Sequence, residues 1–262
     1  MQVNFIIAGT QKGGTTALAK FLAQHPQVCM APVKEVHFFD YDKNYYAQSK
    51  IQAKDLANQS SSQKPNYDYY HSFFPNYHDQ LAVGEATPIY MYLPWVPQRI
   101  YAYNPNMKVI LILRNPIDRA YSQYQMEKSR GWEWLPFPIA IRLEYLRLKL
   151  GANPEAERSP IRTHSYVDRG FYYRQIQNLL KYFDRQNLLI LRNEELQSQH
   201  NQTLRRIYEF LEIDSTIVPP APERILVGKY QQAMQPRDRN YLKRKYHQEI
   251  DRLSQLLNID LS

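Results

Sequence analysis

Short runs of consecutive apolar residues recur along the chain, and segments with helical periodicity or polar composition separate them. Four of these runs, FIIAG, LAVGE, KVILIL and LLILR, lack the alternation of a half-exposed strand and are typical of strands covered on both faces. Strands that alternate with helices favour a parallel sheet. The pattern therefore predicts an α/β fold with a central parallel sheet flanked by helices and with strands at residues 5–9, 81–85, 108–113 and 188–192.

Helical spacing of apolar residues fills much of the chain between these runs. The first helix is predicted to run through Leu18 to Ala23 and to stop before Pro26, because proline cannot continue a helix. A short second strand is predicted after it. Two polar segments, 58–66 and 151–160, indicate surface loops. The same spacing predicts further helices at 171–183, 202–212 and 238–257.

Length, charge and cysteine content narrow the class of protein. A chain of 262 residues can bury the core of one domain, so we expect a single domain over residues 1–262. The net charge of +8 favours an anionic ligand, nucleic acid or an anionic membrane surface. Cys29 is the only cysteine, which excludes a disulfide framework and cysteine-based zinc clusters. With no signal peptide or long apolar run in the sequence, we expect no membrane span, at most peripheral membrane contact, and a cytoplasmic location.

A glycine-rich turn joins the first predicted strand to the first helix in FIIAGTQKGGTTALAKFL. Such a turn aims backbone N–H groups and the positive end of a helix at an anion. Gly9 and Gly14 have the spacing of the nucleotide-binding loop G-x-x-x-x-G-K-[ST], but Thr15 stands in place of its lysine. Lys12 comes three residues earlier, and Thr16 adds a second hydroxyl. The loop therefore predicts a phosphate site in which Lys12 reaches the bridging or outer oxygens of the phosphate.

A second candidate site lies in LILRNPIDRAYSQY. In a nucleoside-triphosphate enzyme, a later buried strand ends in an aspartate that helps to hold magnesium. Here the strand ends in Arg114, whose guanidinium opposes a metal ion and favours a bidentate phosphate contact. Ser122 follows eight residues later, about two turns into a helix. Alone, the two residues would be read as a surface arginine and a helix-interior serine; beside the glycine-rich loop they predict a second phosphate site.

The segment KEVHFFD brings Glu35, His37 and Asp40 close together in the sequence. A general base must lie within hydrogen-bond reach of the proton that it removes, and both carboxylates and imidazole serve in this role. The same side chains would also suit a solvent-facing edge, and His37 with Asp40 would suit a structural pair. The spacing alone leaves these alternatives open.

Taken together and in this order, GTQKGGTTAL, KEVHFFD, GEATPIY and LRNPIDRAYSQY resemble the sulfotransferase family that uses 3′-phosphoadenosine 5′-phosphosulfate (PAPS). The resemblance is nearest to the heparan-sulfate-type branch and its bacterial relatives, and it runs through most of the chain. It implies a P-loop-like three-layer fold. It also implies an enzyme that moves a sulfonyl group from PAPS to an acceptor hydroxyl of a carbohydrate, glycolipid or small metabolite, with no metal and no nucleic-acid partner.

The resemblance also implies roles for single residues. Lys12 serves the oxygen that bridges sulfur and phosphorus, and Glu35 matches the catalytic base, with His37 as the rival base. Ala86 stands where many glycosaminoglycan-modifying members have a lysine, which argues against a heparan-like acceptor. The implied cofactor-binding residues are Lys12, Gly13, Gly14, Thr15, Thr16, Arg114, Ser122, Lys229 and Tyr230, and the implied acceptor-binding residues are Glu35, His37, Asp40 and Tyr90.

Two other classes of protein compete with this interpretation. A P-loop nucleotide kinase or NTPase would depend on magnesium and on a lysine at the position of Thr15, and Arg114 also argues against it. A non-catalytic basic module for nucleic acid would need stacking aromatic residues on a basic face. The tyrosines and the basic segment YLKRKYH supply such residues, but a charged helix face in solvent is the simpler explanation.

Overall fold

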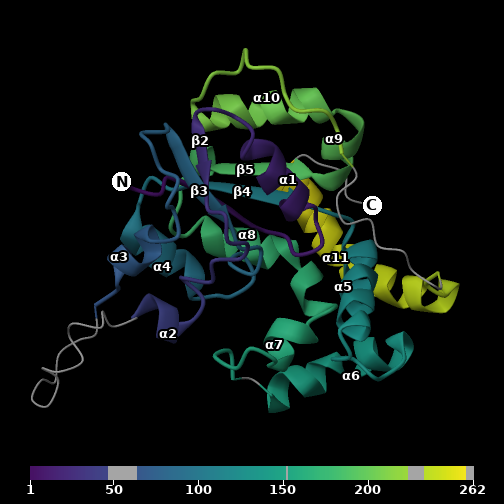
Figure 1. Cartoon of the computed structure of the whole chain (residues 1–262). Helices are drawn as coiled ribbons and strands as arrows, with labels where there is room; N and C mark the ends of the chain where they lie inside the picture. Colours follow the sequence, from purple (N-terminus) through teal and green to yellow (C-terminus); the bar gives the residue numbers. More distant parts are fainter. Residues whose placement is uncertain (47–63, 152, 224–232, 258–262) are drawn as a thin grey trace, which may run out of the picture.

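The computed structural model describes residues 1–46, 64–151, 153–223 and 233–257. The strands of these residues form one five-stranded sheet at the centre of the molecule (Figure 1). The strand order is β2-β3-β1-β4-β5, and each neighbouring pair is parallel. The predicted central parallel sheet is therefore confirmed. Its strands are β1 (Phe5–Gly9), β2 (Val28–Met30), β3 (Ala82–Ala86), β4 (Lys108–Leu113) and β5 (Leu188–Arg192).

Helices cover both faces of this sheet, which is why its central strands are apolar along their whole length. Alternate side chains of β1 and β4 enter two separate clusters of buried residues, because successive residues of a strand point to opposite faces. In Figure 1, α10 lies above the sheet and α8 and α4 lie below it. One cluster includes α1 (Thr15–Leu22) and α10 (His200–Leu211); the other includes α4 (Val96–Tyr103) and α8 (Tyr172–Leu179).

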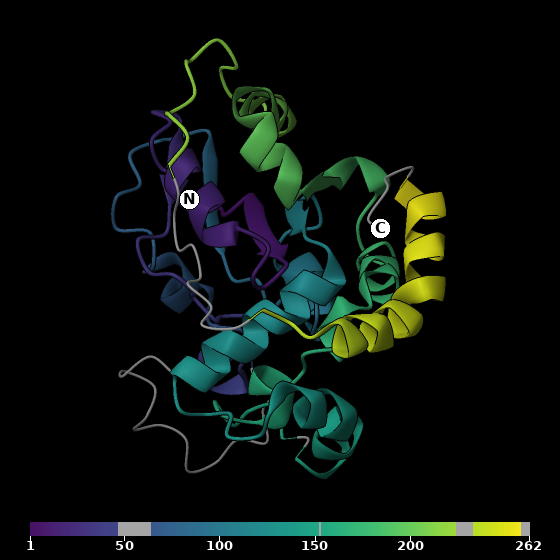
Figure 2. The same cartoon turned by 90° about the vertical axis from the view of Figure 1, so that its right-hand side faces the viewer.

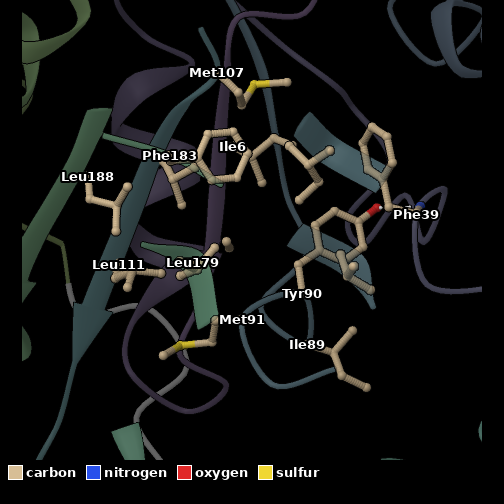
Figure 3. Packing of buried hydrophobic residues seen from close by; sticks show 14 of the residues in the cluster. Ile6, Phe39, Ile89, Tyr90, Met91, Met107, Leu111, Leu179, Phe183 and Leu188 are labelled. Atoms are coloured by element: carbon tan, nitrogen blue, oxygen red, sulfur yellow. Dashed lines mark hydrogen bonds between the residues drawn. The ribbon is translucent and has the colours of Figure 1, made fainter. Parts of the chain in front are cut away.

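The larger cluster also anchors the loops that follow β2 and β3. Figure 3 shows Phe39 and Tyr90 beside Ile6 of β1, within the same packed layer as Leu111 of β4. Phe39 and Tyr90 have no exposed surface. Because KEVHFFD and GEATPIY contribute to the core in this way, their polar residues are fixed relative to the sheet.

A third cluster of buried residues lies beyond the carboxyl end of β4. It joins α5 (Pro116–Ser129), α6 (Phe137–Leu150) and α11 (Pro236–Leu257) through side chains such as Tyr124 and Tyr246. Figure 2 shows the first part of α11 running beside the region of α5 and α6. This cluster forms a wall next to the edge of the sheet at which the glycine-rich loop emerges.

Several helices differ from the sequence-based expectation. The helix predicted over 171–183 ends at Leu179, because the chain turns and the N–H groups of Tyr182 and Phe183 both donate to the Leu179 carbonyl oxygen at 3.0 Å. Phe183 then fills the core. Helices α4 and α6 were not predicted. Neither were the shorter helices α2 (Asp42–Tyr45), α3 (Tyr67–His71), α7 (Pro160–Thr163) and α9 (Asn193–Ser198), nor the 3-10 turns at Asp168–Gly170 and Arg185–Asn187.

The two predicted surface loops and the expected absence of a membrane span concern the rest of the chain. Most of the predicted loop 58–66 lies outside the described residues, and 151–160 contains turns up to the start of α7. Across the ranges described above, no helix has both the length and the apolar character needed to cross a membrane. The single-domain expectation stays a prediction.

Candidate active site

The turn between β1 and α1 is held in one shape by its backbone contacts. The Gly13 N–H donates to the Thr10 carbonyl oxygen at 2.8 Å, and the Thr10 N–H donates to the Ile112 carbonyl oxygen at 3.1 Å. The Asn193 side chain donates to the Gly13 carbonyl oxygen at 2.6 Å. A Cβ atom on Gly13 would lie 2.3 Å from that Ile112 oxygen, and Gly14 has a φ of 107°. Both positions therefore require glycine.

The amino end of α1 presents donors rather than acceptors. Gly14 is the N-cap, no described side chain caps the helix, and its first turn contains no acidic residue. The first N–H groups of a helix have no partner within it and carry the positive end of the helix dipole. Thr15 is buried and Thr16 is partly exposed at this end. The arrangement fits a phosphate group, as predicted for the glycine-rich loop.

Lys12 lies among other cations beside this helix end. Its Nζ is 3.8 Å from the sulfur of Met126, and Arg114 donates to its carbonyl oxygen at 3.3 Å. Burial, followed by the charges of Arg114 and Arg130, lowers the pKa of Lys12. An anion bound here would relieve this repulsion, so the set of donors fits the phosphate groups of a nucleotide.

Arg114 and Ser122 occupy the positions that the sequence predicted. Arg114 follows β4 directly, and the Tyr172 hydroxyl donates to its carbonyl oxygen at 3.0 Å. Asn115 caps α5 by accepting from two backbone N–H groups of its first turn, which sets the direction of the helix. Ser122 lies on α5 and is 2% exposed. Their contact with a 3′-phosphate stays a prediction.

Glu35, His37, Asp40 and Arg162 form a continuous row of charged groups. Nε2 of His37 is 3.4 Å from Oε2 of Glu35, and Nδ1 of His37 is 2.8 Å from Oδ2 of Asp40. Nη1 of Arg162 lies 2.5 Å from the same Asp40 oxygen. The Asp40 and Arg162 side chains are 0% and 4% exposed, whereas those of Glu35 and His37 are 26% and 31% exposed. The row thus runs from the protein interior to two groups that a ligand can reach.

Asp40 fixes the protonation and orientation of His37. Burial opposes charge on both side chains, but their mutual hydrogen bond and opposite charges outweigh it. The pKa of His37 is raised, with a further contribution from the charge of Glu35, and the pKa of Asp40 is lowered, with a further contribution from Arg162. Because a carboxylate only accepts, Nδ1 of His37 carries the proton and Nε2 faces Glu35.

A buried network holds the backbone of KEVHFFD, and its centre is Glu85. The N–H of Val36 donates to the Thr87 hydroxyl at 3.0 Å, and that of Phe38 donates to the Tyr90 hydroxyl at 2.9 Å. Both hydroxyls donate to Glu85, which has no exposed surface. Burial raises the pKa of Glu85 to about 7 although these donors lower it. The sequence analysis noted the motif GEATPIY, which contains Glu85, Thr87 and Tyr90, but it did not predict that Glu85 lies at the centre of a buried network.

Two of the predicted acceptor-binding residues lie inside the protein. Asp40 and Tyr90 are both 0% exposed. Asp40 contacts His37, and the Tyr90 hydroxyl accepts from the backbone of KEVHFFD. Their contact with an acceptor stays a prediction. Lys229 and Tyr230, which the resemblance implies as cofactor-binding residues, lie outside the described residues.

A cavity of about 330 Å³ opens beside Glu35 and His37. Trp132, Arg130 and Glu127 line it, none of which the sequence singled out. Gln11 of the glycine-rich loop lines it as well, so the cavity and the loop adjoin. The side chains that can receive an acceptor and the loop that fits a phosphate therefore share one site.

Aromatic rings with cations above them form part of the cavity wall. The guanidinium groups of Arg130 and Arg158 lie 5.2 and 5.1 Å from the ring centroid of Trp132. Arg162 lies 3.6 Å from the ring centroid of Tyr41, which also lines the cavity. Among the described residues, no three His, Cys, Asp or Glu side chains form a group that could hold a metal ion.

Comparison with known proteins shows the family to which the chain belongs. A family model described as the sulfotransferase domain matches residues 2–255. The chain belongs to the sulfotransferase family. It is similar to human heparan sulfate glucosamine 3-O-sulfotransferase 6, with 31% identity over 207 residues that cover 79% of this chain and 51% of the relative. It is also similar to the human bifunctional heparan sulfate N-deacetylase/N-sulfotransferase 2, with 29% identity over 224 residues that cover 80% of this chain and 22% of the relative.

The chain spans about half the length of the first of these curated relatives, and less of the second. Solved structures share the fold of the chain. The crystal structure of a sulfotransferase from Alicyclobacillus acidocaldarius superposes with a TM-score of 0.79 and 27% identity, covering 99% of this chain and 97% of that one. The sulfotransferase domain of a Synechococcus olefin synthase shares the fold, with a TM-score of 0.52 and 17% identity over 94% of each chain. The predicted sulfotransferase-type α/β fold is confirmed.

Proposed function

We propose that this protein transfers a sulfonyl group from PAPS to a hydroxyl group of a carbohydrate acceptor. The observation that carries the proposal is the position of Glu35 and His37 in a cavity that adjoins the cationic loop at Lys12. Membership of the sulfotransferase family supports the class of reaction. When bound, PAPS would supply the sulfonyl group in a form already activated by its bond to phosphate.

The donor set of the site fits such a nucleotide. The residues that would hold its 5′ end are Lys12 and the backbone of Gly13 to Thr16, where α1 presents its first N–H groups. Arg114, with Ser122 on α5, would hold the 3′-phosphate, because a guanidinium makes strong bidentate contacts with phosphate oxygens. Lys229 and Tyr230 would complete the nucleotide site.

Glu35 is the better of the two candidate bases. Because its pKa is raised, the His37 ring stays protonated up to a higher pH than the ring of a free histidine does. A protonated ring cannot accept a proton. Glu35 lies 3.4 Å from that ring and is open to the cavity. Glu35 would therefore accept the proton of the acceptor hydroxyl, while His37 holds the Glu35 carboxylate in place.

Lys12 would act on the opposite side of the reaction. Its ammonium group would stabilise the negative charge that develops on the phosphate oxygen as the sulfonyl group leaves, and the rigid glycine turn fixes its position. A sulfonyl group carries less charge than a phosphoryl group, so cationic side chains and backbone dipoles would suffice without a metal ion. Arg114 in place of a magnesium-binding aspartate supports this over a kinase or NTPase.

A carbohydrate is the acceptor class that the cavity favours. Its wall combines the rings of Tyr41 and Trp132 with charged groups of both signs, including Glu157 and Arg130. Aromatic surfaces beside polar groups suit a sugar ring, which has apolar faces and a hydroxyl rim. A glycolipid head group or a small hydroxylated metabolite has the same chemistry. A cytoplasmic location remains part of this proposal.

The proposal can be tested by incubating the protein with radiolabelled PAPS and a panel of neutral oligosaccharides, glycosaminoglycans and glycolipids. We expect label to appear in at least one carbohydrate. Glu35→Gln should reduce this transfer by roughly a hundredfold, because it removes the base and keeps the shape of the side chain. Labelling of none of the carbohydrates by a protein that binds the nucleotide would contradict the acceptor class.

A further inference from the structure

Helix α6 exposes an unusual amount of apolar surface. It lies at the periphery of the molecule, away from the central sheet, in both Figure 1 and Figure 2. Twelve large apolar side chains are exposed among the described residues, and six of them lie between positions 134 and 150. These six are Trp134, Ile139, Leu143, Tyr145, Leu146 and Leu150, with exposed fractions from 41% to 81%.

Four of these residues form one continuous stripe. Ile139, Leu143, Leu146 and Leu150 recur every three or four residues and therefore lie on one side of the helix. We call this stripe the outer face of α6. The residues buried against α5 and α11 are on the opposite side of the helix: Phe137, Ala140, Ile141 and Glu144. The helix is thus apolar on two opposite sides, of which packing within the described chain explains one.

Cations flank the outer face on both sides. Arg142 and Lys149 lie along one side of it and Arg147 along the other. Arg142 and Arg147 also pair with the buried carboxylates Asp238 and Glu133. The ammonium group of Lys149 lies 4.6 Å from the ring centroid of Tyr145.

The outer face of α6 carries no acidic residue. Glu144 is the only acidic residue of α6, and its buried carboxylate accepts from the N–H groups of Val167 and Asp168. The neighbouring helix α11 adds one exposed basic residue at this point. The ammonium group of Lys245 lies 5.7 Å and the guanidinium group of Arg142 lies 4.6 Å from the ring centroid of Tyr241.

We propose that the outer face of α6 docks on the surface of an anionic lipid bilayer. Leucine and isoleucine side chains would enter the boundary between headgroups and acyl chains, while the exposed side chains of Lys149 and Arg142 reach the anionic headgroups. Trp134 and Tyr145 suit the same boundary, where aromatic side chains with a polar edge are enriched. A second copy of the chain fits less well, because it would bring two sets of like charges together.

The catalytic cavity lies close to this surface. Trp132 lines the cavity and comes two residues before Trp134, which is the start of the exposed apolar segment. Docking through α6 would therefore bring one rim of the cavity near the lipid headgroups. Membrane binding itself needs neither the sulfonyl donor nor an acceptor, so it can be tested without assuming the proposed function.

Flotation with lipid vesicles tests the proposal on the full chain. We expect the protein to float with phosphatidylcholine vesicles that contain phosphatidylglycerol, and to float less with pure phosphatidylcholine or in high salt. The double variant Leu146→Ser/Leu150→Ser should lower the partition coefficient about tenfold or more, because it removes two side chains from the apolar contact.

A matched control variant separates this effect from a general loss of apolar surface. Leu81→Ser/Val218→Ser alters side chains that are 57% and 80% exposed, against 52% and 79% for Leu146 and Leu150. The control should bind vesicles like the unaltered protein. Equal binding by both double variants, or no binding by the unaltered protein, would overturn the proposal. The proposal would also be overturned if the protein did not bind vesicles but sedimented as a dimer, and if only Leu146→Ser/Leu150→Ser dissociated that dimer.

Discussion

Nδ1 of His37 lies 2.8 Å from Oδ2 of Asp40, a carboxylate that has no exposed surface. The raised pKa of His37 predicts the pH range in which this contact stabilises the fold. Its contribution is fully present below the unfolded pKa of 6.5 and is lost as the pH rises through the raised folded pKa. His37→Gln should therefore cost about 1 kcal/mol more below pH 6.5 than in alkaline solution, as measured by urea unfolding at both pH values.

The His37 ring gives an independent check on this contact. In Asp40→Asn, the pKa of His37 should fall, because its charged partner is lost, and an NMR titration of the ring protons measures this directly. Since Arg162 loses the same partner, the variant should also be destabilised by about 3 kcal/mol. An unchanged His37 titration would show that the contact does not set the charge of the ring.

Tyr90→Phe tests the network that holds KEVHFFD. The Tyr90 hydroxyl accepts from the N–H of Phe38 and donates to Glu85 inside the core. Its loss should destabilise the fold by about 2 kcal/mol and reduce turnover while leaving nucleotide affinity unchanged. Tyr101→Phe alters a tyrosine that is 41% exposed and should change neither quantity. Equal turnover in the two variants would remove Tyr90 from the support of the site.

Gly13→Ala tests the shape of the glycine-rich loop. Its new Cβ would lie 2.3 Å from the Ile112 carbonyl oxygen, so the loop must move, and we expect nucleotide affinity to fall more than about tenfold. Gly131→Ala is the control, because Gly131 has a φ of 71° but nothing within 4 Å of the new methyl group. The control should lose about 1 kcal/mol of stability and no affinity. Calorimetric titration of both variants with adenosine 3′,5′-bisphosphate provides the comparison.

We predict that activity persists without divalent metal ions. The strand end that would carry a magnesium ligand in an NTPase carries Arg114, whose charge repels a cation. Transfer from PAPS should therefore proceed at an unchanged rate in EDTA. Complete inactivation by EDTA that magnesium reverses would favour the kinase interpretation instead.

Local patterns in the sequence predicted the sheet but not the contacts between distant segments. β1 and β4 were predicted with the observed ends, because their apolar runs are continuous and a glycine-rich turn or an Asn-Pro pair follows. The pairing of Asp40 with Arg162 joins residues 122 positions apart, which no local periodicity encodes. The position of Trp132 in the cavity wall likewise depends on the packing of α5 against α6, which local sequence patterns do not show.

Helix α6 shows a different limit of sequence patterns. A single apolar stripe gives a helix its recognisable periodicity, but α6 is apolar on two opposite sides. The two stripes obscure each other in the sequence, so the helix was not predicted. For the site, the sequence indicated Glu35, His37, Asp40 and the glycine-rich loop, but it did not show that Asp40 and Tyr90 are buried, because burial depends on contacts with distant segments.

Calorimetric titration of the unaltered protein and Arg114→Ala with adenosine 3′,5′-bisphosphate and with 5′-AMP tests the central claim most directly. If Arg114 binds the 3′-phosphate of PAPS, the substitution should weaken binding of the bisphosphate by about 1.5–3 kcal/mol, roughly tenfold to a hundredfold, and should hardly affect 5′-AMP. Equal losses for both ligands, or tighter binding of ATP with magnesium than of the bisphosphate by the unaltered protein, would contradict it.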